Sequence, residues 1–175
     1  MYRVDTRNFG INEIIISNVS SYQQSENFNP IIEKILLEQR PIDKKNVDRN
    51  TGLFIFTELS DAIKFSCRMI GSKIYKVSSI KNTTIFHKGD MNWTEVMSKL
   101  IAHESALRHI ATLYWTDCCK TYKPCWEVIV NKVKVVSIII SSEEERKSMQ
   151  KELFSNNCNF NIEKLTLFIN EINKT

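Results

Sequence analysis

The chain of 175 residues carries 24 Lys and Arg against 20 Asp and Glu, a formal net charge of +4, and 42% of its residues are hydrophobic. A chain of this length buries a sizeable core without disulfides or metals, so we expect one domain over residues 1–175. No apolar run is long enough to cross a bilayer, and no dense Lys/Arg stripe marks an obligate nucleic-acid binder.

The cysteines and the N-terminus indicate a cytoplasmic protein. Five cysteines form an odd set without framework spacing, and Cys118 and Cys119 are adjacent, which does not resemble a disulfide scaffold. Residues 2–10 are charged and no hydrophobic segment follows them, so we expect no signal peptide.

The first third of the chain predicts a strand, a helix and a loop. In the opening segment Tyr2 and Val4 alternate with Arg3, Asp5 and Arg7, which predicts a strand with one charged face. Asn29 and Pro30 have the side chains of a helix N-cap and first turn, and apolar residues at helical spacing follow over 31–36. The polar stretch 41–52 is predicted to be a loop.

The remaining elements alternate between strands and helices. Strands are expected at 53–59, 73–80, 83–87, 125–130 and 133–140, and a helix capped by Ser60 is expected to end at Gly71. The longest helical pattern runs from Asn92 or Thr94 to Ala111, and Ser141 or Ser142 caps a helix with an acidic first turn. Residues 160–172 fit either a helix or a strand. This order predicts an α+β fold with a mixed or antiparallel sheet.

Three segments carry a joint pattern: YRVDTR at 2–7, FIFTELSDAIKFS at 54–66 and CWEVIV at 125–130. Together they resemble the mono-ADP-ribosyltransferase superfamily, most visibly bacterial toxins of the cholera and pertussis kind. That family places an arginine pattern on an early strand, a Ser-Thr-Ser-like triplet on a central strand and a glutamate on a late strand. The corresponding residues here are Tyr2–Arg7, Phe56-Thr57-Glu58 and Glu127.

The resemblance implies a split sheet with flanking helices around a cleft that binds NAD as a substrate, with no metal. Glu127 is then the catalytic carboxylate, because a carboxylate that binds the ribose 2′-hydroxyl stabilises oxocarbenium-like charge. It also implies that Arg3 holds the phosphates or the nicotinamide ribose, and that Asp5 and Arg7 support the geometry. Thr57 is expected to orient Glu127.

The sequence departs from the family pattern at two positions, and one of them bears on which molecule accepts the ADP-ribose. Phe56 stands where a serine usually orients the glutamate, and Cys125 stands where arginine-modifying members have a glutamate. The second departure argues against a protein arginine as acceptor. The strand is closer to DNA ADP-ribosyltransferase toxins of the DarT type, so we expect nucleic acid to be favoured over protein. The resemblance further implies a cytoplasmic toxin restrained by an antitoxin, a phage-defence effector, or an effector delivered into other cells.

Other interpretations stay open at this point. The chain is alternatively a catalytically degenerate member of the same fold that binds a nucleotide or a protein. HESALRH lacks the histidine spacing of a zinc protease, but a zinc site from His103, His109 and the cysteines at 118, 119 and 125 is conceivable. Cys125 is also a candidate nucleophile. His87 is expected on the surface. The aromatic residues that are candidates for stacking on nicotinamide or on an acceptor base are Tyr22, Phe28, Tyr114, Trp115, Tyr122 and Trp126. The cations that are candidates for phosphate contacts are Lys44, Lys45, Arg49, Lys120, Lys123, Lys132 and Lys134.

Overall fold

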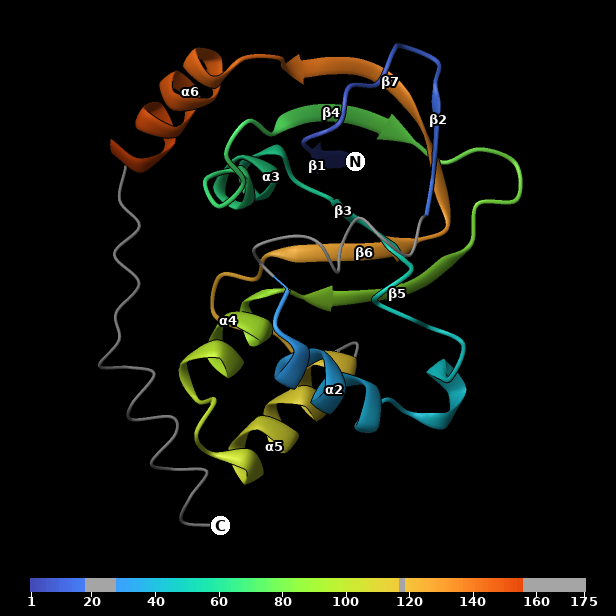
Figure 1. Cartoon of the computed structure of the whole chain (residues 1–175), viewed down its shortest axis with the longest axis vertical. Coiled ribbons are helices and arrows are strands. Elements are labelled where there is room, and N and C mark those ends of the chain that lie inside the picture. Colours follow the sequence, from blue (N-terminus) through green and yellow to red (C-terminus); the bar gives the residue numbers. More distant parts are fainter. Residues whose placement is uncertain (18–27, 117–118, 156–175) are drawn as a thin grey trace.

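The computed structural model describes residues 1–17, 28–116 and 119–155 (Figure 1). The strands are β1 (Tyr2–Asp5), β2 (Ile14–Ile16), β3 (Leu53–Phe56), β4 (Lys73–Ser78), β5 (Ile85–Asp90), β6 (Trp126–Val130) and β7 (Lys132–Ile140). The helices are α2 (Pro30–Glu38), α3 (Leu59–Ser66), α4 (Asn92–Lys99), α5 (Glu104–Trp115) and α6 (Glu143–Ser155), with a short 3₁₀ helix η1 (Ile42–Lys44). The predictions for Tyr22, Cys118 and residues 160–172 lie outside the described residues.

One antiparallel sheet of seven strands organises the described chain, in the order β2-β7-β4-β1-β3-β6-β5. The α+β class and the antiparallel sheet are therefore confirmed. Strands β1 and β3 pair at a single position, Tyr2 opposite Phe56, whereas β3 and β6 pair along their length from Leu53–Val130 to Phe56–Glu127. The three segments selected from the sequence thus lie on neighbouring strands, β1, β3 and β6.

Two helix starts follow the chemistry predicted for them. The Asn29 side chain accepts hydrogen bonds from the backbone N–H groups of Ile31 and Ile32, and Pro30 occupies the first turn of α2. At α6 the Ser142 hydroxyl accepts from the Glu145 N–H, while the Glu145 carboxylate accepts from the N–H of Ser142. This reciprocal arrangement is a capping box. Helix α3 instead begins at Leu59, one residue before the predicted cap Ser60.

The predicted single helix from residue 92 to 111 is wrong, because a turn at residues 100–103 divides it into α4 and α5. In this turn the Leu100 N–H donates to the Met97 carbonyl and the His103 N–H to the Leu100 carbonyl. The turn lets α5 fold back so that both helices place apolar residues in one core cluster. A continuous helix would carry α5 away from that cluster.

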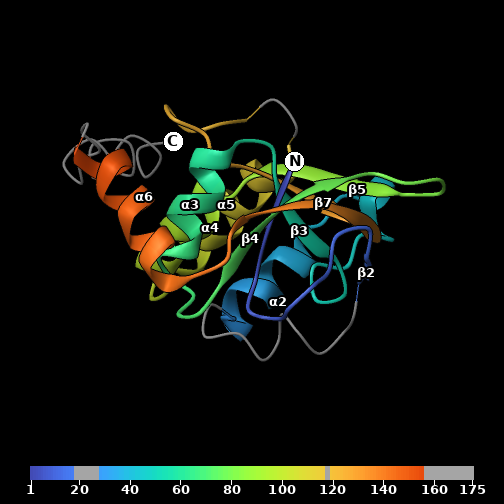
Figure 2. The same cartoon turned by 90° about the horizontal axis from the view of Figure 1, so that it is seen from above.

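The helices cover the sheet in two groups. Helices α2, α4 and α5 lie together against β5 and β6, and their apolar residues form one core with Phe54 and Ile129 (Figure 1). Helix α3 packs in another cluster with Val4, Phe56 and Ile74. Viewed from above, α6 lies beside α3 at one end of the molecule (Figure 2).

Gly52 tests the packing of β3 against β6. A Cβ added at Gly52 would lie 2.2 Å from Cγ2 of the buried Ile129. We expect Gly52→Ala to lower the free energy of unfolding by roughly 1–3 kcal/mol, measured by urea denaturation, because overpacking a tight core forces neighbouring atoms to shift. The control is Gly10→Ala, where the nearest atom is 3.7 Å away on the Glu13 side chain. Equal stabilities of the two variants would contradict the expectation.

Candidate functional site

A cavity of about 320 Å³ opens between the two helix groups, and we call it the central cavity. Its walls come from β1, β3, β6, the start of α2, the end of α3 and α4. Its volume is at the lower end of the range of ~300–1,000 Å³ typical of small-molecule pockets. The described residues that line it are Arg3, Val4, Phe28, Asn29, Ile32, Glu33, Arg49, Gly52, Phe54, Phe56, Phe65, Arg68, Met69, Met91, Thr94, Glu95, Ser98 and Glu127.

Glu127 lies at the deep end of this cavity. It is the second residue of β6, lies opposite Phe56 of β3, and is only 2% exposed. Strand alternation places it on the same face as Ile129, which packs against the helices, as the sequence predicts. Its Oε1 accepts hydrogen bonds from Arg49 Nη1 and from the Tyr114 hydroxyl, each at 2.6 Å. The carboxylate therefore has a defined orientation.

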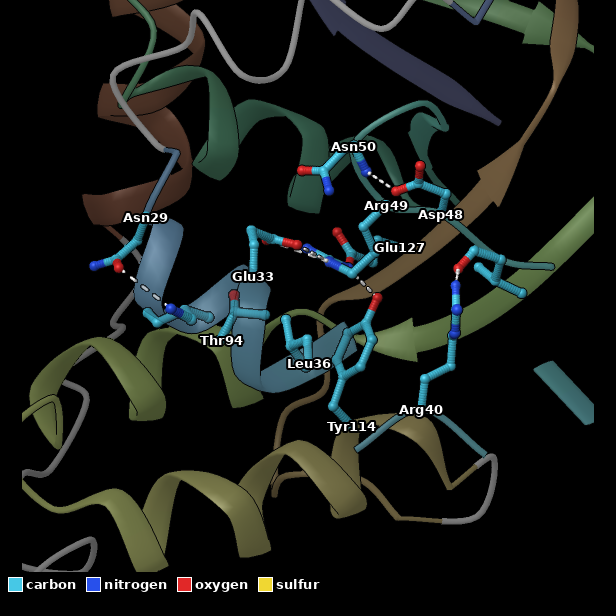
Figure 3. A network of polar contacts seen from close by, with 12 residues as sticks. Asn29, Glu33, Leu36, Arg40, Asp48, Arg49, Asn50, Thr94, Tyr114 and Glu127 are labelled. Atoms are coloured by element: carbon cyan, nitrogen blue, oxygen red, sulfur yellow. Dashed lines mark hydrogen bonds and ion pairs between the residues drawn. The ribbon is translucent and has the colours of Figure 1, made fainter. Parts of the chain in front are cut away.

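Arg49 is the residue that joins this site together. Its guanidinium donates from Nε to Glu33 Oε2 at 3.1 Å and from Nη1 to Glu127, so one cation is shared by two buried carboxylates (Figure 3). Nη1 also donates to the Tyr114 hydroxyl. The rings of Phe54 and Tyr114 lie 4.8 Å from the guanidinium carbon. These contacts hold Arg49 by hydrogen bonds and by cation–π attraction.

The local fold of the loop before β3 brings Arg49 to this position. The Asp48 side chain accepts a hydrogen bond from the Asn50 N–H at 2.9 Å, and the Asp48 carbonyl accepts from the Gly52 N–H at 3.0 Å. These bonds close a tight turn directly around Arg49 (Figure 3). In the sequence, Arg49 is one of several cations that are candidates for phosphate contacts. The residue types next to it indicate a turn, but nothing in the sequence marks its buried partners.

The Tyr114 hydroxyl stays protonated, which suits its role as a hydrogen-bond donor. Burial raises the pKa of the Tyr114 hydroxyl well above its usual value of 10, and the neighbouring Glu127 charge acts in the same direction against the opposing effect of Arg49. The hydroxyl therefore keeps its proton at neutral pH and donates a hydrogen bond to Glu127. The sequence suggested Tyr114 only as a stacking ring, and it did not single out Glu33.

The charged residues of β1 form a second cluster. Asp5 Oδ2 accepts from Arg3 Nη2 at 2.9 Å and from Arg7 Nη2 at 2.8 Å, and Arg3 Nη1 donates to the Phe54 carbonyl at 2.8 Å. Arg3 therefore crosses from β1 to β3, where the sheet has a single residue pair, and it lines the central cavity. Asp5 and Arg7 support Arg3 and are not among the cavity-lining residues.

Asp5 is ionised throughout the physiological range. Burial by itself would raise the pKa of this carboxyl, but hydrogen bonds from Arg7 and the charge of Arg3 outweigh burial and lower the pKa to about 2. The hydrogen bond to Asp5 also raises the pKa of Arg7. The cluster therefore stays fully charged and holds Arg3 in place.

Thr57 stands apart from this arrangement. It follows the end of β3, its backbone N–H donates to the Trp126 carbonyl at 3.4 Å, and it is not a lining residue of the central cavity. The side chain that faces Glu127 across the strands is Phe56. The orienting bonds to the carboxylate come from Arg49 and Tyr114, in the place where the resemblance had assigned Thr57.

The histidine and cysteine candidates do not converge in the described part of the chain. No group of three or more His, Cys, Asp or Glu side chains is arranged to hold a metal ion there. His103 precedes α5 and is exposed, as is His109 within it. Burial raises the pKa of the Cys125 thiol, which disfavours the thiolate that a nucleophile requires. His87 is buried beneath Tyr114 and Trp115, so its predicted surface position is wrong.

A second hollow, which we call the β5 hollow, lies along the edge strand β5. It has a volume of about 420 Å³ and is lined by Lys44, Ile85, Phe86, His87, Lys88 and Trp126. The Lys88 ammonium lies 4.7 Å from the centre of the Trp126 ring. The NAD-binding candidate Arg3 and the catalytic candidate Glu127 both line the central cavity. The central cavity is therefore the candidate active site.

Two comparisons with known proteins found no relative of this chain. No protein-family model matches the sequence, and a search of curated proteins found no match. Among the described residues, no helix combines the length and the apolar character that crossing a bilayer requires.

The Asp5 cluster has a testable dependence on pH. Because the pKa falls from 3.8 to about 2 on folding, the ionised carboxylate stabilises the folded state by roughly 2 kcal/mol above pH 4. This contribution is lost as the pH falls through 2. We expect Asp5→Asn to be less stable than wild type by about that amount at pH 7, with the difference shrinking towards pH 2, in urea denaturation at both pH values. The exposed Glu104→Gln is the control, and a pH-independent difference would contradict the assignment.

Arg49 is expected to be essential for stability. Arg49→Met leaves Glu33 and Glu127 buried without their shared cation, which costs roughly 3–5 kcal/mol. Arg108→Met removes a half-exposed cation that pairs with Glu38 and Glu104, and we expect a much smaller loss of stability because solvent screens exposed ion pairs. Urea denaturation at pH 7 measures both. Similar losses in the two variants would show that the Arg49 network contributes no more than a surface ion pair.

Proposed function

We propose that this chain is an NAD-dependent mono-ADP-ribosyltransferase that transfers ADP-ribose to a macromolecule. One observation carries the proposal: Arg3 from the first strand and Glu127 from the sixth line the same cavity. These are the two residues to which the family resemblance assigns NAD binding and catalysis. Their strands are connected through β3, the strand that carries the third segment of the pattern.

The proposed chemistry begins at Glu127. Cleavage of the nicotinamide–ribose bond builds positive, oxocarbenium-like charge on the ribose, and a carboxylate that accepts the ribose 2′-hydroxyl stabilises this charge. Arg49 and Tyr114 hold the Glu127 carboxylate at one oxygen, Oε1. Both bonds are made at Oε1, and in this mechanism Oε2 is the oxygen that accepts the hydroxyl. A pre-oriented group loses little freedom when the substrate binds.

The other lining residues suit NAD. An arginine has five N–H donors, and Arg3 uses three of them on Asp5 and Phe54 in the described part of the chain. The others suit phosphate or ribose oxygens. Phe54 and Phe56 belong to the apolar part of the cavity lining, which suits the nicotinamide ring. The deep end of the cavity would take the nicotinamide riboside half of the molecule.

The β5 hollow supports a nucleic-acid acceptor. Its Trp126 is next to Glu127 on β6 but points to the opposite face of the strand, and the described residues that line the hollow include two lysines and no carboxylate. Two lysines beside the half-buried Trp126 ring suit the phosphates and a base of a nucleic acid. The cellular setting, a cytoplasmic toxin with an antitoxin or a defence effector, is proposed from the family resemblance alone.

One observation favours the alternative, a binding module of the same fold without turnover. The Glu127 carboxylate is already paired with Arg49 and is nearly fully buried. A carboxylate neutralised in this way attracts a developing cation less strongly. The alternative predicts that the chain binds NAD without releasing nicotinamide.

Labelled NAD distinguishes the two functions and identifies the acceptor. The purified chain is incubated with NAD labelled in the ADP-ribose moiety and with separate pools of DNA, RNA and lysate protein. We expect release of nicotinamide and label in a nucleic-acid pool. Label in protein alone would reverse the choice of acceptor, and NAD binding without nicotinamide release would favour the binding module.

Glu127→Gln is the decisive variant. It keeps the size of the side chain but removes the charge, so we expect nicotinamide release to fall by at least about a hundredfold. Glu33→Gln is the matched control, because Glu33 bonds the same arginine, and we expect it to lose less than about tenfold. Thermal melting confirms that both variants are folded. Equal activities of Glu127→Gln and wild type would refute the assignment.

A further inference from the structure

The charges that line the central cavity balance. Among the described lining residues three are arginines and three are glutamates, namely Arg3, Arg49, Arg68, Glu33, Glu95 and Glu127. Arg49 is shared by two of the glutamates, and Arg3 pairs with Asp5 behind the cavity wall. A ligand with a diphosphate therefore meets little net positive charge unless one of these pairs opens.

The pair most easily opened is Arg68–Glu95. Arg68 follows α3, Glu95 lies on α4, and their ion pair connects the two helical walls of the cavity. The two side chains are 44% and 27% exposed, against 3% for Glu127, so the pair lies at the outer end. Exposed ion pairs contribute little to stability, and a competing anion replaces one partner readily.

Arg68 is also well suited to donate hydrogen bonds to phosphate at this end. The neighbouring Thr94 and Ser98 hydroxyls donate at 2.7 Å to the backbone carbonyls of Met91 and Glu95. Their protons are therefore already engaged. A guanidinium, by contrast, presents several N–H groups in a planar fork that matches phosphate oxygens.

We propose that Arg68 is the diphosphate-binding residue of the central cavity and that Glu95 is an internal competitor for it. Glu95 holds the guanidinium in the free protein, and the diphosphate of a dinucleotide takes its place. The identity of this ligand as NAD rests on the proposed function. The assignment places the adenosine diphosphate half at the outer end, with Glu127 at the deep end.

The two partners of this pair then have opposite effects on binding. Arg68→Gln removes the cation, and we expect it to weaken ADP-ribose and NAD binding by roughly tenfold. Glu95→Gln removes the competitor, and we expect it to strengthen binding by roughly threefold to tenfold. Titration calorimetry of the full chain with ADP-ribose measures this without any turnover. If the pair only held the two helical walls together, both substitutions would weaken binding.

The control pair is Arg108 and Glu104, which join one turn of α5 to the next outside the cavity. Arg108→Gln and Glu104→Gln are expected to change the affinity by less than about twofold. Nicotinamide release is measured on the same proteins. Weakening by both cavity variants, or no ADP-ribose binding by wild type, overturns the assignment of Arg68. Opposite effects on ADP-ribose without nicotinamide release support the site and refute the transferase.

Discussion

The contact on which the rest of this site depends is the guanidinium of Arg49 between the carboxylates of Glu33 and Glu127. All three side chains are buried, and each comes from a different part of the fold: a loop, helix α2 and strand β6. A buried charge is costly unless it is paired and hydrogen-bonded, so each of these residues requires the others. Tyr114 of α5 adds a fourth contact. The network thereby joins α2 and α5 to β6 and closes the deep end of the cavity.

The same network has two opposing effects on the Glu127 carboxylate. Arg49 orients Glu127, which favours the proposed catalysis, and also offsets the charge of Glu127, which disfavours it. Both effects follow from burial, because the attraction between Arg49 and Glu127 is strong enough to fix the carboxylate only where the local dielectric constant is low. At the outer end the Arg68–Glu95 pair is partly exposed, so solvent screens it more. The cavity therefore combines a buried inner pair with a partly exposed outer pair, which is the one that a ligand would displace in the proposed binding mode.

Much of the fold was predictable because local physics specifies it. An apolar, aromatic run identified the strand near 53–56 and alternating residues identified the strand near 73–78. Asn29 and Ser142 marked helix starts through their own side-chain bonds. The prediction failed where packing overrides local pattern. The apolar periodicity from 92 to 111 continues through the turn that separates α4 from α5. Strand β2, of three residues, was not predicted, because pairing with β7 defines it.

For the site, the sequence determined which face of β6 carries Glu127, because side chains alternate along a strand whatever the strand pairs with. It also determined that Arg3 and Asp5 share a face of β1. Only the tertiary structure decided that Arg3 and Glu127 line one cavity, that Arg49 pairs with Glu127, and that Thr57 lies outside the network. The reason is that Arg49 and Glu127 are 78 positions apart, and a buried ion pair over that separation leaves no local periodicity in either segment.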